Sequence, residues 1–165
     1  MSNLLSRRDV TGAMAAGLIA QFLQTVPSRA AIEPGAARNA DAFNARSPES
    51  VYRALGIATP QETPDIIINV PDVAENGANV PIEVTVKLPA ATRVLVIGER
   101  NIFPLLADVA LLPPASTTGG RAAPWLEVKG RLAETSHVRV IVEADGKLYT
   151  AARNVRVIVG GCLPG

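Results

Sequence analysis

The fold class is decided by one stretch, HVRVIVEA at residues 137–144, followed directly by Asp145-Gly146. Its three valines fall on one face of an extended chain, because successive side chains of a strand point to opposite sides, and Ile141 falls on the other face with charged residues. Asp-Gly favours a tight hairpin turn, in which both central residues have positive φ. Strand-forming residues continue through 147–153 and then 154–159. The stretch therefore predicts an antiparallel hairpin.

Similar short segments recur through the chain before this hairpin. They lie at Ile66–Val70, Ile82–Val86, Val94–Ile97, Ala107–Leu112 and Trp125–Lys129. Turn residues separate them at intervals of roughly 8–12 residues, which is typical of antiparallel sandwiches. We therefore expect an all-β fold, an immunoglobulin-like antiparallel β-sandwich over residues 65–159. With one cysteine in the chain, no disulfide can join the sheets, so burial alone must hold them together.

A short helix is predicted before the sandwich, within residues 31–64. Ser47 is a good N-cap, and Pro48 suits the first helical position because its missing N–H is not needed there. Gly56 can end the helix in a left-handed conformation. A helix of about two turns is too short to be stable alone, so it should pack on the sandwich.

Residues 1–30 have the features of an export signal. Ser6-Arg7-Arg8 supplies a charged region, Val10–Val26 is weakly apolar, and Pro27–Ala30 resembles a cleavage site. The arginine pair favours the twin-arginine route; an ordinary secretory signal and an amphipathic helix of a cytosolic protein are the alternatives. Polar residues interrupt the apolar run, which makes it a poor membrane span. We expect a periplasmic product with no membrane span after cleavage.

The composition excludes several classes of function. The net charge of +1 argues against a nucleic-acid binder that neutralises phosphates. One cysteine and one histidine leave no spacing typical of a zinc site, and the chain has no GxSxG, HExxH or phosphate-binding glycine loop. We therefore expect no metal, no cofactor and no self-sufficient enzyme.

The chemistry is predicted to lie in the last six residues, Gly160-Gly161-Cys162-Leu163-Pro164-Gly165. Two glycines after a strand free the backbone, and six extended residues span about 20 Å. Cys162 has no partner in its own chain, and a thiolate forms sulfur–sulfur bonds that can later be cleaved. This pattern favours a carrier that delivers a covalent sulfur adduct to other proteins. The alternatives are an Ig-like binding or scaffold module with a vestigial tail, a thiol redox protein and, least well matched, a prenylated cysteine.

Several segments together resemble the SoxY family of sulfur-oxidation carriers. They are Ser6–Arg8, a helix ending near Leu55-Gly56, Ile68–Gly77 followed by Val80–Ile82, Arg100–Leu105, and Val155–Cys162. The resemblance implies a SoxYZ complex with a SoxZ subunit, in which Cys162 is the attachment site and Gly160 and Gly161 are the hinge. It further implies loading with thiosulfate by the haem c cytochrome SoxXA, trimming by the hydrolase SoxB and, in some organisms, oxidation by a sulfane dehydrogenase.

The sequence departs from the family after the cysteine, where the family ends Gly-Gly-Cys-Gly-Gly. Leu163 adds a bulky side chain, and Pro164 restricts its own backbone and that of Leu163. This tail makes a SoxY-like paralogue of another pathway a further alternative.

Three other positions are assigned structural roles, and one edge of the sandwich is assigned to the partner subunit. Trp125 is predicted to be a core or interface aromatic, His137 a surface or strand-edge residue, and Asn76-Gly77 part of a turn. An edge strand of the sandwich is predicted to contact the partner subunit, because an unpaired edge is a ready docking surface.

Overall fold

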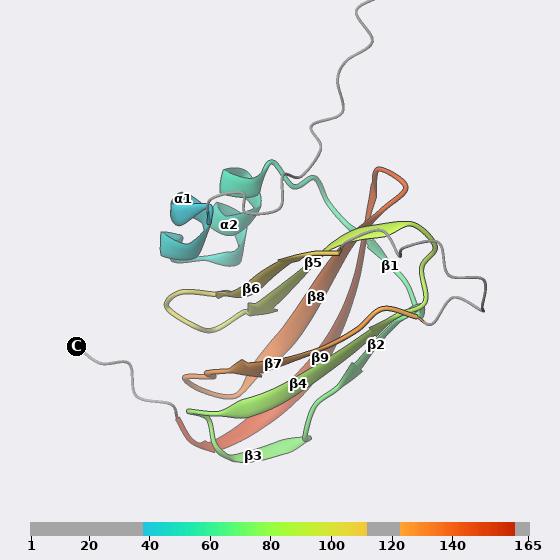
Figure 1. Cartoon of the computed structure of the whole chain (residues 1–165). Coiled ribbons are helices and arrows are strands. Elements are labelled where there is room, and N and C mark those ends of the chain that lie inside the picture. The colour runs from blue at the N-terminus through green and yellow to red at the C-terminus, as the bar shows by residue number, and fades with distance from the viewer. Residues whose placement is uncertain (1–37, 112–122, 161–165) are drawn as a thin grey trace, which may run out of the picture. The chain divides into compact units, whose positions relative to one another are not determined.

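The computed structural model describes residues 38–111 and 123–160 (Figure 1). The chain divides into Met1–Glu33 and Pro34–Gly165, and the fold belongs to the second of these units. The helices are α1 (Ala40–Asn44) and α2 (Pro48–Leu55). The strands are β1 (Gln61–Glu62), β2 (Ile66–Asn69), β3 (Val73–Asn76), β4 (Val80–Val86), β5 (Ala91–Gly98), β6 (Leu105–Ala110), β7 (Trp125–Gly130), β8 (Ser136–Ala144) and β9 (Lys147–Val159).

The strands form two sheets. One has the order β1-β9-β8-β5-β6, with β3 also paired to β9, and the other has the order β2-β4-β7 (Figure 1). This arrangement confirms the predicted immunoglobulin-like β-sandwich. Two pairings are not antiparallel: β1 and β3 both run parallel to β9. The strand β9 is one continuous element of 13 residues, so it is long enough to carry both short strands on the edge away from β8.

The β8–β9 hairpin forms where the sequence predicts it. Asp145 and Gly146 have φ of 52° and 70°, the positive values that a tight hairpin turn requires. The register then runs without a shift from Ala144 opposite Lys147 to Ser136 opposite Val155. Beyond this last pair the two strands separate, and β9 continues alone beside β3.

The core between the sheets consists almost entirely of aliphatic side chains. Its fully buried members include Val80, Ile82, Val84, Val86, Val94, Val96, Leu132, Val138, Val140, Val142 and Val155. Because these valines and isoleucines alternate along their strands with residues of the other face, burying them fixes the register of each strand. The sandwich is thus held by burial, as expected for a chain that cannot form an intramolecular disulfide.

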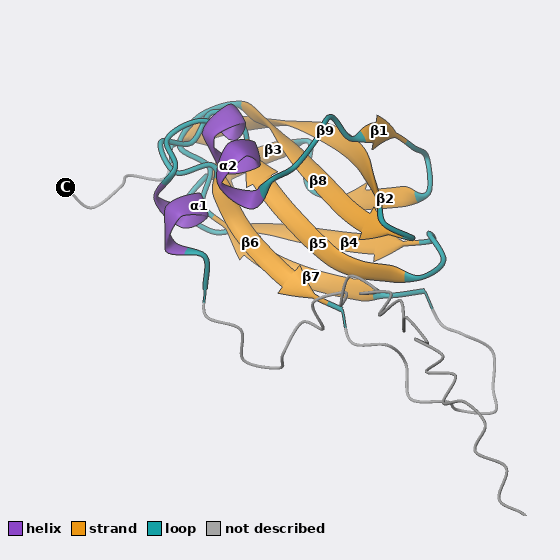
Figure 2. Cartoon of the chain, turned by 90° about the horizontal axis from the view of Figure 1, so that it is seen from above, coloured by secondary structure: helices purple, strands orange, loops and turns teal. Residues whose placement is uncertain are grey.

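A second apolar layer lies on the outer face of the larger sheet, beneath the helices (Figure 2). It joins Ala42 and Val51 of the helices to Leu95, Ile97, Leu105 and Ile141 of the sheet. Strand β5 is consequently buried on both faces from Val94 to Gly98. The position of Ile141 among the charged residues of β8 has its explanation here, because that face is covered by helices.

Helix α2 has the predicted ends. The Ser47 hydroxyl accepts a hydrogen bond from the Ser50 N–H at 3.2 Å, and Pro48 is the first helical residue. Gly56 closes the helix with φ of 64°. The short helix α1 and the strands β1 and β3 have no counterpart in the predicted elements, and β6 begins two residues earlier than the segment predicted at 107–112.

Candidate functional site: the root of the C-terminal arm

The structure describes the chain up to Gly160, two residues before Cys162. Cys162 and the other residues after Gly160 lie outside the described part of the chain. The described residues just before them form an anchored segment. We call it the arm root and define it as Val159 and Gly160 together with the two residues that hold them, Gly77 and Ala133.

Gly77 connects the end of β9 to the segment before β8. Its N–H donates to the Val159 carbonyl at 2.8 Å, and its own carbonyl accepts from the Leu132 N–H at 2.7 Å. The preceding Asn76 pairs with Val159 in the parallel β3–β9 ladder, and its side-chain oxygen accepts from the Ala78 N–H at 2.9 Å. The segment Ala74–Gly77 therefore holds the end of β9 in place, in addition to making the predicted turn.

Gly160 lies directly against the Ala133 carbonyl. A Cβ placed on Gly160 would meet the Ala133 oxygen far inside van der Waals distance, and that oxygen is backbone, so it cannot yield as a flexible side chain does. The φ of Gly160 is not positive, unlike that of Gly56 and Gly146. A glycine is therefore required at position 160 because a side chain would not fit, and not because of the backbone angle. Its predicted role as a hinge together with Gly161 stays a prediction.

Asn101 fixes the segment against which Gly160 rests. Its Nδ2 donates to the Arg131 carbonyl at 2.6 Å, and its Oδ1 accepts from the Ala133 N–H at 3.0 Å. A single side chain from the β5–β6 loop thereby holds the backbone on both sides of Leu132. Two segments that are far apart in sequence, 74–77 and 100–105, meet at the arm root through these contacts.

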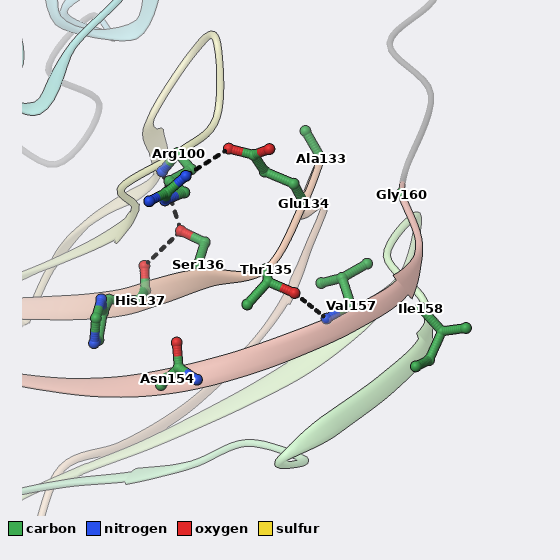
Figure 3. Close-up of a pocket in the computed structure, with 10 residues that line it drawn as sticks. All are labelled: Arg100, Ala133, Glu134, Thr135, Ser136, His137, Asn154, Val157, Ile158 and Gly160. Carbon is green, nitrogen blue, oxygen red and sulfur yellow. Dashed lines mark hydrogen bonds and ion pairs between the residues drawn. The ribbon is translucent and has the colours of Figure 1, made fainter.

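A polar cavity of about 520 Å³ opens beside the arm root (Figure 3). Its lining includes Arg100, Glu134, His137, Asn154 and Gly160. It forms where β8 and β9 separate, so its walls come from the start of β8, the end of β9 and the β5–β6 loop.

Two hydroxyl groups of the cavity are engaged with the backbone (Figure 3). The Ser136 hydroxyl accepts from the Arg100 N–H at 3.0 Å and donates to the His137 carbonyl at 3.1 Å. The Thr135 hydroxyl accepts from the Val157 N–H at 3.0 Å, which ties β9 to the start of β8 after their ladder has ended. Both hydroxyls therefore serve to hold the walls of the cavity together.

The charged side chains at this end of the sandwich form one ion pair and one group of three residues. Arg100 contacts Glu134 at 3.4 Å, and both side chains are largely exposed, so water screens this pair. Glu99 accepts from Arg139 at 2.5 Å and lies 3.7 Å from the His137 ring nitrogen Nδ1. The cavity therefore presents an arginine and a histidine to solvent close to the arm root.

Comparisons with known proteins give matches that include the region just described. The family described as sulfur oxidation protein SoxY matches residues 52–162, from helix α2 to the cysteine. The chain belongs to the SoxY family. The resemblance found in the sequence is thus confirmed, and the matched range contains the whole arm root.

A solved member of the SoxY family has the same fold. It is described as the sulfur carrier protein SoxY from Chlorobium limicola f thiosulfatophilum, and its sequence is 35% identical. The similarity covers 66% of this chain and 89% of that chain, with a TM-score of 0.56. None of the curated proteins matches this chain closely enough to count as a relative.

Most of the predicted site residues of this SoxY-family chain lie outside the described residues. They are Ser6, Arg7 and Arg8 of the export signal, and Gly161, Cys162, Leu163, Pro164 and Gly165 of the arm. Gly160 is described, and the structure brings it together with Gly77 and Ala133. The importance of Gly77 and Asn101 for the anchor was missed, although the segments that contain them carry the resemblance to SoxY.

Two other predicted assignments can be compared with the structure. Trp125 is 60% exposed, so its assignment to the core is wrong, while its assignment to an interface stays a prediction. His137 is exposed on β8, as predicted for a surface or strand-edge residue.

The described residues contain neither a metal cluster nor a membrane span. No three His, Cys, Asp or Glu side chains in this part of the chain gather closely enough to hold a metal ion. Neither of the two helices described is both long and apolar enough to cross a bilayer.

Proposed function

We propose that this SoxY-family protein is a carrier that holds sulfur-oxidation intermediates covalently on Cys162 and presents them to separate enzymes. One observation carries the proposal: the last described strand, β9, ends at Val159 beside the anchored Gly160, and the only cysteine in the sequence follows Gly160 by two residues. A thiol placed there belongs to the tether and not to the core. Such a thiol can enter the reaction centre of another protein while the sandwich stays outside.

The loading step is oxidative and joins two sulfur atoms. The Cys162 thiol loses its proton, the outer sulfur of thiosulfate bonds to the cysteine sulfur, and two electrons leave the pair. The acceptor proposed for these electrons is a haem c cytochrome of the SoxXA type. The chain supplies only the thiol, because a thiolate is the nucleophile in sulfur–sulfur chemistry.

The following steps release the oxidised sulfur. A hydrolase of the SoxB type uses water to cleave the bond between the two sulfurs of the bound thiosulfate. Sulfate and two protons leave, and a persulfide anion remains on Cys162. A sulfane dehydrogenase is the proposed oxidant of that remaining sulfur in organisms that possess one. On this proposal the carrier catalyses none of these steps.

The proposed setting is the periplasm, with a SoxZ-like subunit as the constant partner. Support for export comes from Ser6-Arg7-Arg8 and the weakly apolar run that follows. Twin-arginine export suits a protein that leaves the cytoplasm already folded with its partner. The partner is expected to bind an edge strand of the sandwich, because edge strands present backbone groups for pairing.

A second candidate, a SoxY-like paralogue of another pathway, is favoured by the end of the chain. Leu163 and Pro164 replace the two glycines that follow the cysteine in the family pattern. A bulky side chain and a proline narrow the range of paths by which the arm can enter a tunnel. Under this candidate Cys162 still carries sulfur, but the enzymes that use it differ.

Intact-mass spectrometry tests the carrier proposal. Protein purified from cells grown on thiosulfate should carry adducts heavier by sulfur-containing groups. Reductant should remove them, and Cys162→Ser should lack them. An unmodified wild-type mass under these conditions would contradict the proposal and favour an Ig-like scaffold module. Loading of wild-type protein with a different sulfur compound, and not with thiosulfate, would support the paralogue.

A further inference from the structure

We propose that the end of β9 and the β5–β6 loop together form the surface on which the enzymes that act on Cys162 dock. We call this surface the docking face and define it as Ile158 and Val159 of β9 with Ile102 and Phe103 of the loop. The inference rests on the proposed function and adds the location of its enzyme contacts. Its occupant is an enzyme whose entrance offers apolar side chains.

The short distance from the arm root to the cysteine limits where such an enzyme can bind. Cys162 follows Gly160 by two residues, and each extended residue spans about 3.3–3.6 Å, so their Cα atoms are at most about 7 Å apart. Gly160 rests on Ala133, and Val159 is bonded to Gly77, so the tether begins at a fixed point. An enzyme with an enclosed reaction centre must therefore bring its entrance against the surface around Gly160.

The strand end at this point is apolar on both sides. Ile158 is 59% exposed and Val159 is 61% exposed. Successive residues of a strand point to opposite sides, so neither side chain can cover the other. A half-buried strand normally alternates apolar and polar residues, and contiguous exposed apolar surface marks an interaction site. The end of β9 departs from that alternation where the tether begins.

The β5–β6 loop, which supplies Arg100 to the same cavity, carries further exposed apolar side chains. Ile102 and Phe103 are both exposed, and Arg100 of the same loop lines the cavity together with Ile158 and Gly160 (Figure 3). The loop and the strand end therefore both border this cavity, next to the arm root. The Arg100 guanidinium of this loop is already paired with the Glu134 carboxylate at 3.4 Å, so we expect the contact with the enzyme to be mainly apolar.

The smaller sheet offers a matched control surface. Trp125 and Ile67 are also exposed apolar residues, and both lie opposite Thr85, near the end of β4 away from Val80. Gly130 pairs with Val80 at the other end of that sheet, two residues before Leu132, which is bonded to Gly77. The control residue, Ile67, is thus comparable in character to Ile158 and Val159 but lies at the end of the smaller sheet remote from the arm root.

The experiment compares two variants of the complex with its SoxZ-like subunit. One carries Ile158→Ser with Val159→Ser, and the control carries Ile67→Ser alone, because Trp125 is a predicted interface residue and is left unchanged. Each is incubated with thiosulfate and the haem c cytochrome, which accepts the two electrons, and the adduct is followed by intact mass. We expect kcat/KM for loading to fall at least about tenfold in the first variant, as for the loss of central interface anchors, and by less than about twofold in the control.

A small aromatic disulfide reagent reports on the thiol itself. It needs no docking surface, so its rate with Cys162 should be equal in all three proteins. If the first double variant does not fold, Val159→Thr keeps the shape and the strand preference, and its loading rate should fall by about threefold or more.

Three results would overturn the inference. If the wild type acquires no adduct, the proposed function fails and the docking face with it. If the wild type and the first variant are loaded equally fast, the docking face alone is wrong. If that variant loses its SoxZ-like subunit, or converts a self-associated form to a monomer in sedimentation experiments, the face belongs to the subunit or to a second copy of the chain.

Discussion

The two ends of β9 both depend on a glycine, but for different physical reasons. At the hairpin end, Gly146 has a positive φ, and nothing lies within 4 Å of the place where its Cβ would be. At the arm root, Gly160 has no positive φ, and a Cβ would collide with the Ala133 carbonyl. One glycine is needed for a backbone angle, and the other is needed for space.

The difference separates local from long-range control of the structure. The hairpin turn is specified by two adjacent residues, Asp145 and Gly146. The arm root is specified by residues far away in the sequence, since Gly77, Asn101 and Ala133 all meet near Gly160. Substitutions at the arm root should therefore have larger effects than those in local turns and caps, and four substitutions test this order.

Gly160→Ala should give the largest loss of stability. We expect the free energy of unfolding to fall by about 2–3 kcal/mol, as for overpacking against a rigid neighbour. Urea denaturation of the purified protein measures the change. A loss below about 0.5 kcal/mol is within the range of ordinary surface substitutions. Such a result would show that the arm root accommodates the added methyl group with little strain.

Asn101→Ala should have the next largest effect. It removes the donor to the Arg131 carbonyl and the acceptor for the Ala133 N–H, so we expect a loss of about 1–2 kcal/mol. Asn101→Asp keeps the acceptor and should lose less. Urea denaturation again provides the measurement, with Asn154→Ala, at an exposed position, as the control. Equal stability of Asn101→Ala and this control would exclude a role for Asn101 in the anchor.

Gly146→Ala should cost about 1 kcal/mol, because a side chain is strained at positive φ even where space is free. Thermal unfolding of this variant beside Gly160→Ala compares the two ends of β9 directly. A greater loss at Gly146 than at Gly160 would reverse the proposed order.

Glu49→Gln should have the smallest effect, and a pH-dependent one. Hydrogen bonds from its own backbone N–H and from Ser47 hold the pKa of Glu49 below its usual value of 4.5. A lowered pKa stabilises the folded protein above pH 4.5, and this contribution is lost as the pH falls through the folded-state pKa. The melting temperature of the variant should thus lie slightly below that of the wild type near pH 7, and the two should converge in acid. A difference that grows in acid would contradict this assignment.

The locally encoded parts of the fold could be predicted from the sequence. Ser47, Pro48 and Gly56 define the helix ends through contacts within one or two turns, and Asp145-Gly146 defines the hairpin. Trp125 alternates with Leu126, and this period of two places the indole on the outer face of β7. The alternation, and not the size of the ring, therefore decides the exposure of Trp125.

The parallel pairings and the arm root could not be predicted in the same way. Strand β3 contains Glu75 and Asn76, which have little preference for strands, and it forms because β9 offers an edge for pairing. Nothing near Gly160 in sequence indicates that Ala133 lies beside it. The predicted role of Cys162 rests on the residue type and the two glycines before it, whereas the anchor depends on tertiary contacts.

The central place of β9 has a mechanical consequence for the proposed carrier, whose C-terminal end would be held in the reaction centre of another protein. This strand has β8 along one edge and β1 and β3 along the other. A pull on the C-terminus acts along the strand, whereas the hydrogen bonds of the antiparallel β8 ladder run across it. The hydrogen bonds of this ladder are therefore loaded in shear and share the force, so they do not break one after another. Withdrawal of the tether from a tight tunnel should therefore release the tunnel's grip before it unravels the sandwich.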